Sequence, residues 1–94
     1  MKKYQLLYII DIDATPEVKE ETIAKFNALI ETLGGTILEV DKWGAKAYAF
    51  PINRKKEGYY VLVNFESNPN ALEEVERQMR INEVIVRQMI TLYE

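Results

Sequence analysis

The sequence predicts an α+β fold in which two helices cover one face of a four-stranded antiparallel sheet. Three observations lead to this prediction. Four short runs are rich in β-branched and aromatic residues. Two further segments each begin with a helix-capping residue followed by proline, and they lie after the first and third of these runs. With 94 residues and 48% hydrophobic content the chain can bury one core, so we expect a single domain over residues 1–94.

The first strand and the first helix follow from the residue types at the start of the chain. Residues 2–10 mix Tyr, Leu and Ile and end in polar residues, which is typical of a strand that enters a turn. Thr15 then suits a helix cap, Pro16 the first helical position, and Gly34 with Gly35 the stop. One apolar stripe is expected along this helix, formed by Val18, Thr22, Phe26, Leu29, Ile30 and Leu33.

A long β-hairpin is predicted in the middle of the chain. Residues 36–50 and 58–65 are two β-rich runs, and the polar residues 51–57 between them suit a long connecting loop. Gly44 predicts a bulge or bend in the first of these strands.

A second helix and a last strand complete the predicted fold. Asn68 and Pro69 repeat the cap-then-proline signal, and residues 84–93 are strand-like again. The second helix is expected to bury Leu72, Val75 and Met79. The resulting order, βαββαβ, is the split βαβ arrangement of the ferredoxin-like fold. Both crossovers place their helices on one face of the sheet, so the other face is expected to be open to solvent or to a partner.

Several classes of function are made improbable by what the chain lacks. It has no cysteine and no histidine, which removes disulfides, thiolate nucleophiles, Cys/His zinc sites and imidazole catalysis. We therefore expect no metal and no cofactor, and a reducing, cytoplasmic setting. The longest apolar run, residues 6–10, is far shorter than the roughly 20 residues of a membrane-spanning helix, so no membrane contact is expected.

An enzymatic function has little support in the sequence. Acid/base catalysis would depend on carboxylate pairs such as Asp11 with Asp13 or Glu73 with Glu74, which are more often solvated surface groups. Acylphosphatases share the predicted topology, but the segment after the first strand offers neither the arginine nor the glycines of their phosphate loop. We expect no catalytic residue, no small-molecule substrate and no enzyme activity.

The sheet strands resemble in part those of the RNA recognition motif, whose aromatic side chains stack on bases. Residues 7–12 are similar to its shorter signature, and the longer one is partly matched by Lys56, Gly58, Tyr59, Val61, Val63 and Phe65. Glu57 and Tyr60 depart from that pattern. For Tyr8 we favour packing against a helix over stacking on RNA, and the motif remains an alternative interpretation.

A basic and aromatic segment extends from Lys42 to Lys56. It contains five basic residues, three aromatic residues and no acid. Subtracting its +5 from the net charge of −3 leaves −8 on the rest of the chain. Such a concentration favours a polyanion as partner, although a solubilising hairpin tip would also be basic. Trp43, Tyr48 and Phe50 lie among the cations and favour an RNA or protein interface.

Two segments resemble the hallmark sequences of one family, the sixth protein of the bacterial small ribosomal subunit. The first comprises Trp43, Gly44, Lys46, Ala49, Pro51, Ile52, Gly58, Tyr59 and Tyr60. The second comprises Met79, Arg80, Ile81, Asn82, Glu83, Val84 and Arg87. The opening Met1, Lys2, Lys3 and Tyr4 is similar too, so the resemblance covers essentially the whole chain.

This resemblance implies a non-catalytic protein of the cytoplasmic ribosome. It would bind the central domain of 16S ribosomal RNA together with the eighteenth small-subunit protein as heterodimer partner. The resemblance and the basic loop together predict RNA contacts at Lys2, Lys3, Tyr4, Arg54, Lys55, Lys56, Arg80, Asn82 and Arg87. The partner protein is expected to contact Trp43, Lys46, Tyr48 and Phe50.

Other interpretations of these residues remain open. Members of the family often carry a second basic residue after Lys46 and a tyrosine before the proline, whereas this chain has Ala47 and Phe50, which favours protein over RNA as the ligand of this strand. The alternative for Arg80 and Arg87 is pairing with Glu76 or Glu83, and the alternative for Asn82 is capping of the turn into the last strand. A domain that self-associates through the open sheet face is the remaining alternative.

Overall fold

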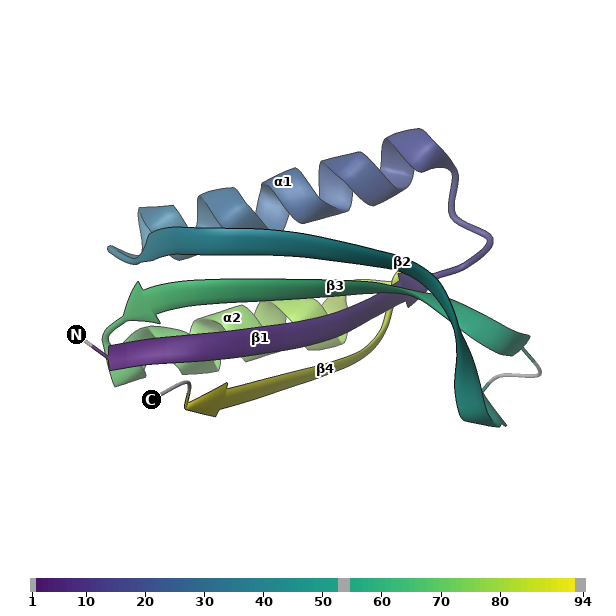
Figure 1. The fold of residues 1–94 in the computed structure, drawn as a ribbon. Helices are drawn as coiled ribbons and strands as arrows, with labels where there is room; N and C mark the ends of the chain where they lie inside the picture. Colours follow the sequence, from purple (N-terminus) through teal and green to yellow (C-terminus); the bar gives the residue numbers. More distant parts are fainter. Residues whose placement is uncertain (1, 53–54, 93–94) are drawn as a thin grey trace.

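Six elements follow one another in the order βαββαβ in a computed structural model of the chain (Figure 1). They are β1 (Lys2–Asp11), α1 (Pro16–Thr32), β2 (Thr36–Ile52), β3 (Lys55–Ser67), α2 (Pro69–Ile81) and β4 (Ile85–Leu92). The structure describes the backbone of residues 2–52 and 55–92 and the side chains of residues 2–47 and 56–92. The predicted α+β, ferredoxin-like fold is confirmed.

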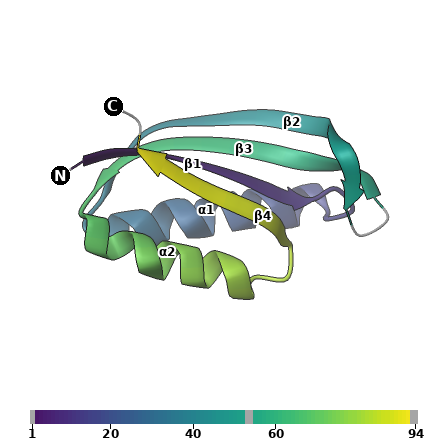
Figure 2. The same ribbon diagram turned by 90° about the horizontal axis from the view of Figure 1, so that it is seen from below.

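The four strands form one antiparallel sheet in the order β2-β3-β1-β4. Each helix connects two strands that do not lie side by side in the sheet, and both helices lie on the same face (Figure 2). In the described part of the chain the other face carries no helix. The strands β2 and β4 are the two edges of the sheet.

Local signals fix the ends of α1 as predicted. The Thr15 hydroxyl oxygen accepts a hydrogen bond from the Val18 backbone N–H at 3.2 Å, and Pro16 opens the helix. The helix ends at Thr32, and Gly34 follows with φ of 91°, a conformation that favours glycine.

The buried stripe of α1 differs from the prediction. Its buried side chains are Thr22, Ile23, Phe26 and Ile30. Ile23 was missed, while Val18, Leu29 and Leu33 are only partly buried. Because the helix crosses a twisted sheet, its contact line turns toward Ile23 in the first half.

The core lies between the helices and one face of the sheet. Alternate side chains of β1 and β3 enter it, because successive residues of a strand point to opposite faces. They are Tyr4, Leu6, Tyr8 and Ile10 from β1 and Val61, Val63 and Phe65 from β3, together with Phe26, Ile30, Val75 and Met79 from the helices. The predicted burial of Val75 and Met79 is confirmed, and Leu72 packs against this cluster.

The direction of Tyr8 separates two interpretations of the sheet. Its side chain is fully buried on the helix side, where its ring centre lies 6.1 Å from that of Phe26. Val61, Val63 and Phe65 lie on that same side. The core position predicted for Tyr8 is confirmed. The rings that an RNA recognition motif would offer to bases are therefore not on the open face, which argues against that interpretation.

The hairpin between β2 and β3 is more extended than predicted. The ladder continues through the pairs Ala47–Glu57 and Ile52–Lys55, so most of the loop expected at residues 51–57 is strand, and residues 53–54 lie outside the described residues. Polar composition suggested a loop, but the backbone of these residues continues the ladder. Glu57 pairs with β2 and not with β1, so the hairpin projects beyond the rest of the sheet (Figure 1). Gly44 has φ of 82° at a register shift, as predicted.

The last helix and strand confirm the predicted positions with small changes at the ends. Asn68 occupies the N-cap position of α2, but its side chain makes no capping hydrogen bond. Before β4, the Asn82 side-chain oxygen accepts from the Val84 N–H at 3.0 Å, so Asn82 does shape this turn. The strand expected at residues 84–93 is observed at Ile85–Leu92. Among the described residues, neither helix is long and apolar enough to cross a membrane.

Removal of the Tyr8 hydroxyl is expected to leave the protein as stable or to raise its free energy of unfolding by about 1 kcal/mol. The hydroxyl is buried and has no hydrogen-bond partner among the described residues. Burial also raises the pKa of Tyr8. Above pH ~10 the unfolded wild-type chain ionises at Tyr8 while the folded protein does not, so the wild type loses stability there and Tyr8→Phe does not lose this part. Urea unfolding of the wild type and Tyr8→Phe at pH 7 and pH 11 tests this. A loss above 1 kcal/mol at pH 7 would contradict it.

Candidate functional site

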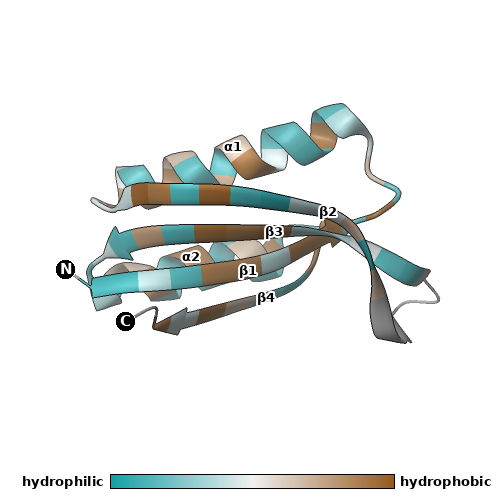
Figure 3. Cartoon of the chain, viewed as in Figure 1, coloured by the Kyte–Doolittle hydropathy of each residue, from teal (hydrophilic) through white to brown (hydrophobic). Residues whose placement is uncertain are grey.

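A band of apolar side chains crosses the open face of the sheet. The pairing registers place Leu7 between Met89 of β4 and Leu62 of β3, and Ile9 between Arg87 and Tyr60. The middle of β1 and of β3 is brown in Figure 3, because apolar residues of the open face alternate there with apolar residues of the core. The band is bounded on one side by Gln5, which donates a hydrogen bond to Asn64 across the strands at 3.2 Å. An apolar centre with a polar rim is typical of a protein interface.

An aromatic corner lies where this band reaches β2. The Trp43 and Tyr60 rings are stacked, with centres 6.3 Å apart and planes 10° apart. The Trp43 indole N–H donates to Asp41 at 3.1 Å, and the Lys46 ammonium lies 5.5 Å from the Trp43 ring centre. Trp43 is 41% exposed, so it is held in place yet remains accessible. Such a fixed, accessible ring suits the anchor of an interface.

The predicted partner residues are only partly described. Trp43 and Lys46 are both exposed on β2 and meet in the aromatic corner. Tyr48 and Phe50 belong to β2, but their side chains lie outside the described residues. Tyr60 was not singled out as a site residue. Its contact depends on the Gly44–Tyr60 pairing across the bulge, which no sequence signal indicates.

Lys42 does not belong with the other cations of its segment. Its ammonium donates to both carboxylate oxygens of Glu20 in α1 at 2.9 Å, on the helix side of the sheet. This hydrogen bond raises the pKa of Lys42. Since the pair is exposed, it adds at most about 1 kcal/mol to stability. Lys42 therefore connects β2 to α1 and is not directed at a partner of the open face.

The predicted RNA contacts do not form one patch. Lys2 and Lys3 are exposed at the start of β1, and Lys56 is exposed on the projecting hairpin. The side chains of Arg54 and Lys55 lie outside the described residues. Arg80 and Arg87 are exposed in different layers: Arg80 on α2, and Arg87 on the open face opposite Ile9.

Tyr4 is placed where its ring cannot stack on a base. It is 7% exposed and belongs to the core, with its ring centre 5.9 Å from that of Phe65. Its position in β1 is on the helix side, with Leu6 and Tyr8. This burial argues against base stacking as the form of the RNA contact expected at Tyr4. Alternation along β1 made this outcome predictable once Tyr8 was assigned to the core.

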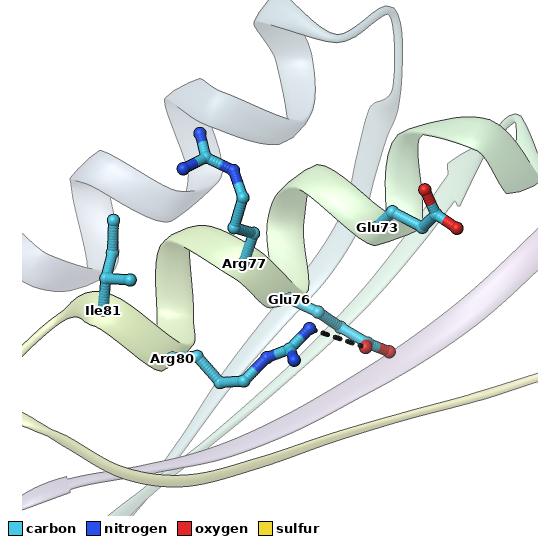
Figure 4. Close-up of a pocket in the computed structure, with 5 residues that line it drawn as sticks. All are labelled: Glu73, Glu76, Arg77, Arg80 and Ile81. Carbon is cyan, nitrogen blue, oxygen red and sulfur yellow. Dashed lines mark ion pairs between the residues drawn. The ribbon is translucent and has the colours of Figure 1, made fainter.

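Two arginines of α2, Arg77 and Arg80, differ in how firmly they are held. Figure 4 draws both and marks the ion pair between Arg80 and Glu76. Arg77 donates two hydrogen bonds to the Glu74 carboxylate, both at 2.8 Å. These bonds, with one from Gln78, lower the pKa of Glu74 to about 2. Arg80 lies 3.8 Å from Glu76 and its side chain is 67% exposed. Arg80 can therefore bind another anion with a smaller loss of existing interactions than Arg77.

Comparison with known proteins places the whole chain in one family. The profile of the family described as "Ribosomal protein S6" matches residues 3–91. A "Small ribosomal subunit protein bS6" of Exiguobacterium sp. is 43% identical over 91 residues, covering 97% of this chain and 96% of that protein. The protein of the same name from Clostridium novyi is 40% identical over 90 residues, covering 96% and 95%.

A solved structure agrees with this relationship. The crystal structure of 30S ribosomal protein S6 from Thermotoga maritima is 25% identical in sequence and superposes with a TM-score of 0.94. The match covers 98% of this chain and 87% of that chain. With the family profile and the relatives above, it establishes that the chain belongs to the ribosomal protein S6 family, the proteins of that name in the bacterial small ribosomal subunit.

Proposed function

We propose that the protein is a non-catalytic component of the small subunit that binds the central domain of 16S ribosomal RNA together with the eighteenth small-subunit protein. Its membership of the S6 family supports a ribosomal role. The observation that carries the RNA contact is Arg80, which is exposed in the Arg-Ile-Asn-Glu run and only loosely paired with Glu76. A phosphate oxygen can replace that carboxylate.

Basic side chains at separate places would make the RNA contact. Lys2 and Lys3 extend from the start of β1, and Lys56 from the hairpin. Arg54 and Lys55 directly precede Lys56 in the sequence and are proposed as contacts from their residue type. Asn82 is a polar neighbour of Arg80, although its side-chain oxygen is engaged in the turn. Contacts this far apart neutralise phosphate and recognise the shape of a folded RNA, and they are not suited to reading a base sequence.

The partner protein would bind at the aromatic corner and along β2. Trp43 and Lys46 are accessible there, and Tyr48 and Phe50 continue the same strand. The chain has a net charge of −3, so its few cations act against a repulsive total charge when it meets RNA alone. We therefore infer that a partner is needed for tight binding.

A filter-binding titration with a 16S central-domain fragment tests this dependence. The isolated chain is expected to bind weakly, and addition of the eighteenth protein is expected to raise the affinity for the RNA at least about tenfold, or 1.4 kcal/mol. Tight binding that the partner does not change would contradict the proposal. The same titration with Trp43→Ala tests the aromatic corner, because loss of partner binding should reduce the affinity gain.

Two neutral variants of α2 provide a matched test of Arg80. Arg80→Gln is expected to reduce the slope of log affinity against log salt concentration by about one unit, since one phosphate contact is lost. Arg77→Gln removes the same charge one turn away, but Arg77 is already held by Glu74, so its slope should stay unchanged. Equal slopes for both variants and the wild type would rule out Arg80 as a phosphate contact. Circular dichroism confirms that both variants fold.

A further inference from the structure

The outer edge of β4 is a free strand edge with few protective features. In the sheet order β2-β3-β1-β4 its only strand neighbour is β1, so the backbone groups on its outer side are left without a strand partner among the described residues. Its sequence IVRQMITL contains one charged residue, Arg87, and no proline or glycine. Natural proteins usually protect such edges with charges, prolines or bulges.

The opposite edge of the sheet, formed by β2, carries several of these protective features. The strand β2 has three register shifts against β3, one of them at Gly44 with its left-handed conformation. It also carries Glu39, Asp41, Lys42 and Lys46, and a proline at position 51. These features disfavour the addition of another strand to β2. The strand β4 has a single register shift against β1, between Ile9 and Ile10, and a single charged residue, so it is less protected than β2.

A hollow lies beside the β4 edge on the open face. It has a volume of about 310 Å³ and is lined by Leu7, Ile9, Arg87, Gln88 and Met89. Met89 is 55% exposed and Leu92, further along the edge, is 53% exposed. A strand added to β4 would have alternate side chains on this face, and one of them would lie over the hollow. The lining favours an aliphatic side chain there.

Arg87 adds a charge preference to this edge. It lines the hollow, and its side chain is exposed on the open face between Ile9 and solvent. A guanidinium at the rim of an apolar hollow pairs well with a carboxylate, which can accept two parallel hydrogen bonds from it. An added strand with an acidic residue two positions from its aliphatic one would match both features, because both side chains then lie on the same face.

We propose that the β4 edge binds an extended segment of another protein by strand addition. The segment presents an aliphatic side chain to the hollow beside Met89 and a carboxylate to Arg87. Backbone hydrogen bonds along β4 supply affinity, and the two side-chain positions supply selectivity. This site lies on the opposite edge of the sheet from Trp43 and Lys46, so it goes beyond the proposed partner contact, and it gives Arg87 a ligand other than the RNA expected from the sequence.

The test uses the full chain and immobilised twelve-residue peptides with valine alternating with threonine. One central valine is replaced by glutamate, glutamine or lysine, so that this side chain lies on the same face as the remaining valines. The wild-type chain is expected to bind the glutamate peptide about fivefold more tightly than the lysine peptide, the equivalent of roughly 1 kcal/mol for one exposed ion pair. Arg87→Glu should reverse that order. Met89→Lys should weaken binding of all three peptides, while Lys46→Glu on the other edge should change none.

Hydrogen exchange locates the contact. Amides of β4 should exchange more slowly with the glutamate peptide present, while those of β2 stay unchanged. Absence of binding by any peptide, or binding that Arg87→Glu does not reorder, overturns the proposal. If the peptides fail and Arg87→Gln lowers the salt slope of RNA binding by about one unit, the ligand of Arg87 is RNA. If sedimentation shows a dimer that Met89→Lys dissociates, the occupant of the edge is a second copy of the chain. RNA as the ligand and a second copy as the occupant each overturn the proposal. Both leave the tests of RNA and partner binding described under the proposed function intact.

Discussion

Replacement of Phe65 by alanine is expected to lower the free energy of unfolding by about 3–5 kcal/mol. The Phe65 side chain is fully buried in the middle of the core and contacts Tyr4 with ring centres 5.9 Å apart. Alanine would leave a cavity between the sheet and the helices that the surrounding strands cannot close. Since domains of this size are stable by about 5–15 kcal/mol, the loss is a large part of the total. Urea unfolding followed by circular dichroism measures it.

Two further variants distinguish a cavity from a general effect of losing an aromatic residue. Phe65→Leu keeps most of the volume and should cost clearly less than Phe65→Ala. Trp43→Ala removes a larger ring on the open face, where 41% exposure limits the loss. If Trp43→Ala destabilises the protein as much as Phe65→Ala, the assignment of the core to the helix side is wrong.

Replacement of Gly35 by alanine is expected to destabilise the protein by about 1–3 kcal/mol because there is no space for a Cβ atom. A Cβ at this position would lie 2.8 Å from the Glu66 carbonyl oxygen and 2.8 Å from the Ile30 Cγ2 atom. The Gly35 N–H also donates to the Ile30 carbonyl at 2.9 Å, so the backbone cannot move away without losing that bond. Thermal unfolding of the variant measures the effect.

The neighbouring glycine supplies the control, because its constraint has a different cause. A Cβ at Gly34 would meet no atom within 4 Å, but φ is 91°. Gly34→Ala should therefore cost about 1–2 kcal/mol from backbone strain alone. Asparagine tolerates the left-handed region, so Gly34→Asn should recover part of this loss, whereas Gly35→Asn should be worse than Gly35→Ala. Recovery at Gly35 instead of Gly34 would contradict the assignment.

Much of the fold was predictable because its signals are local. The Thr15 cap, the glycine stop of α1 and the bulge at Gly44 depend on backbone conformations that few residue types allow. The hairpin ends were not predictable in the same way. Lys55 and Glu57 look like loop residues, yet their backbone pairs with β2 and extends the ladder, and this pairing depends on register more than on residue type.

The candidate site was less predictable than the fold. The sequence identified Trp43 and Lys46 as accessible residues of one strand, and it identified the basic residues by type. It grouped Tyr4 with them, although alternation places Tyr4 in the core. It also placed Lys42 in the basic segment, although Lys42 is paired with Glu20 on the helix side.

The sequence by itself determined the order of the six elements, because this order depends on periodicity, caps and glycines. Only the tertiary structure decided which surface each functional side chain occupies. Arg80 and Arg87 are seven positions apart, yet a helix and an edge strand place them in different layers. Trp43 and Tyr60 are far apart in sequence, yet the strand register stacks their rings. Register and layer arise from long-range pairing, and no local propensity encodes them.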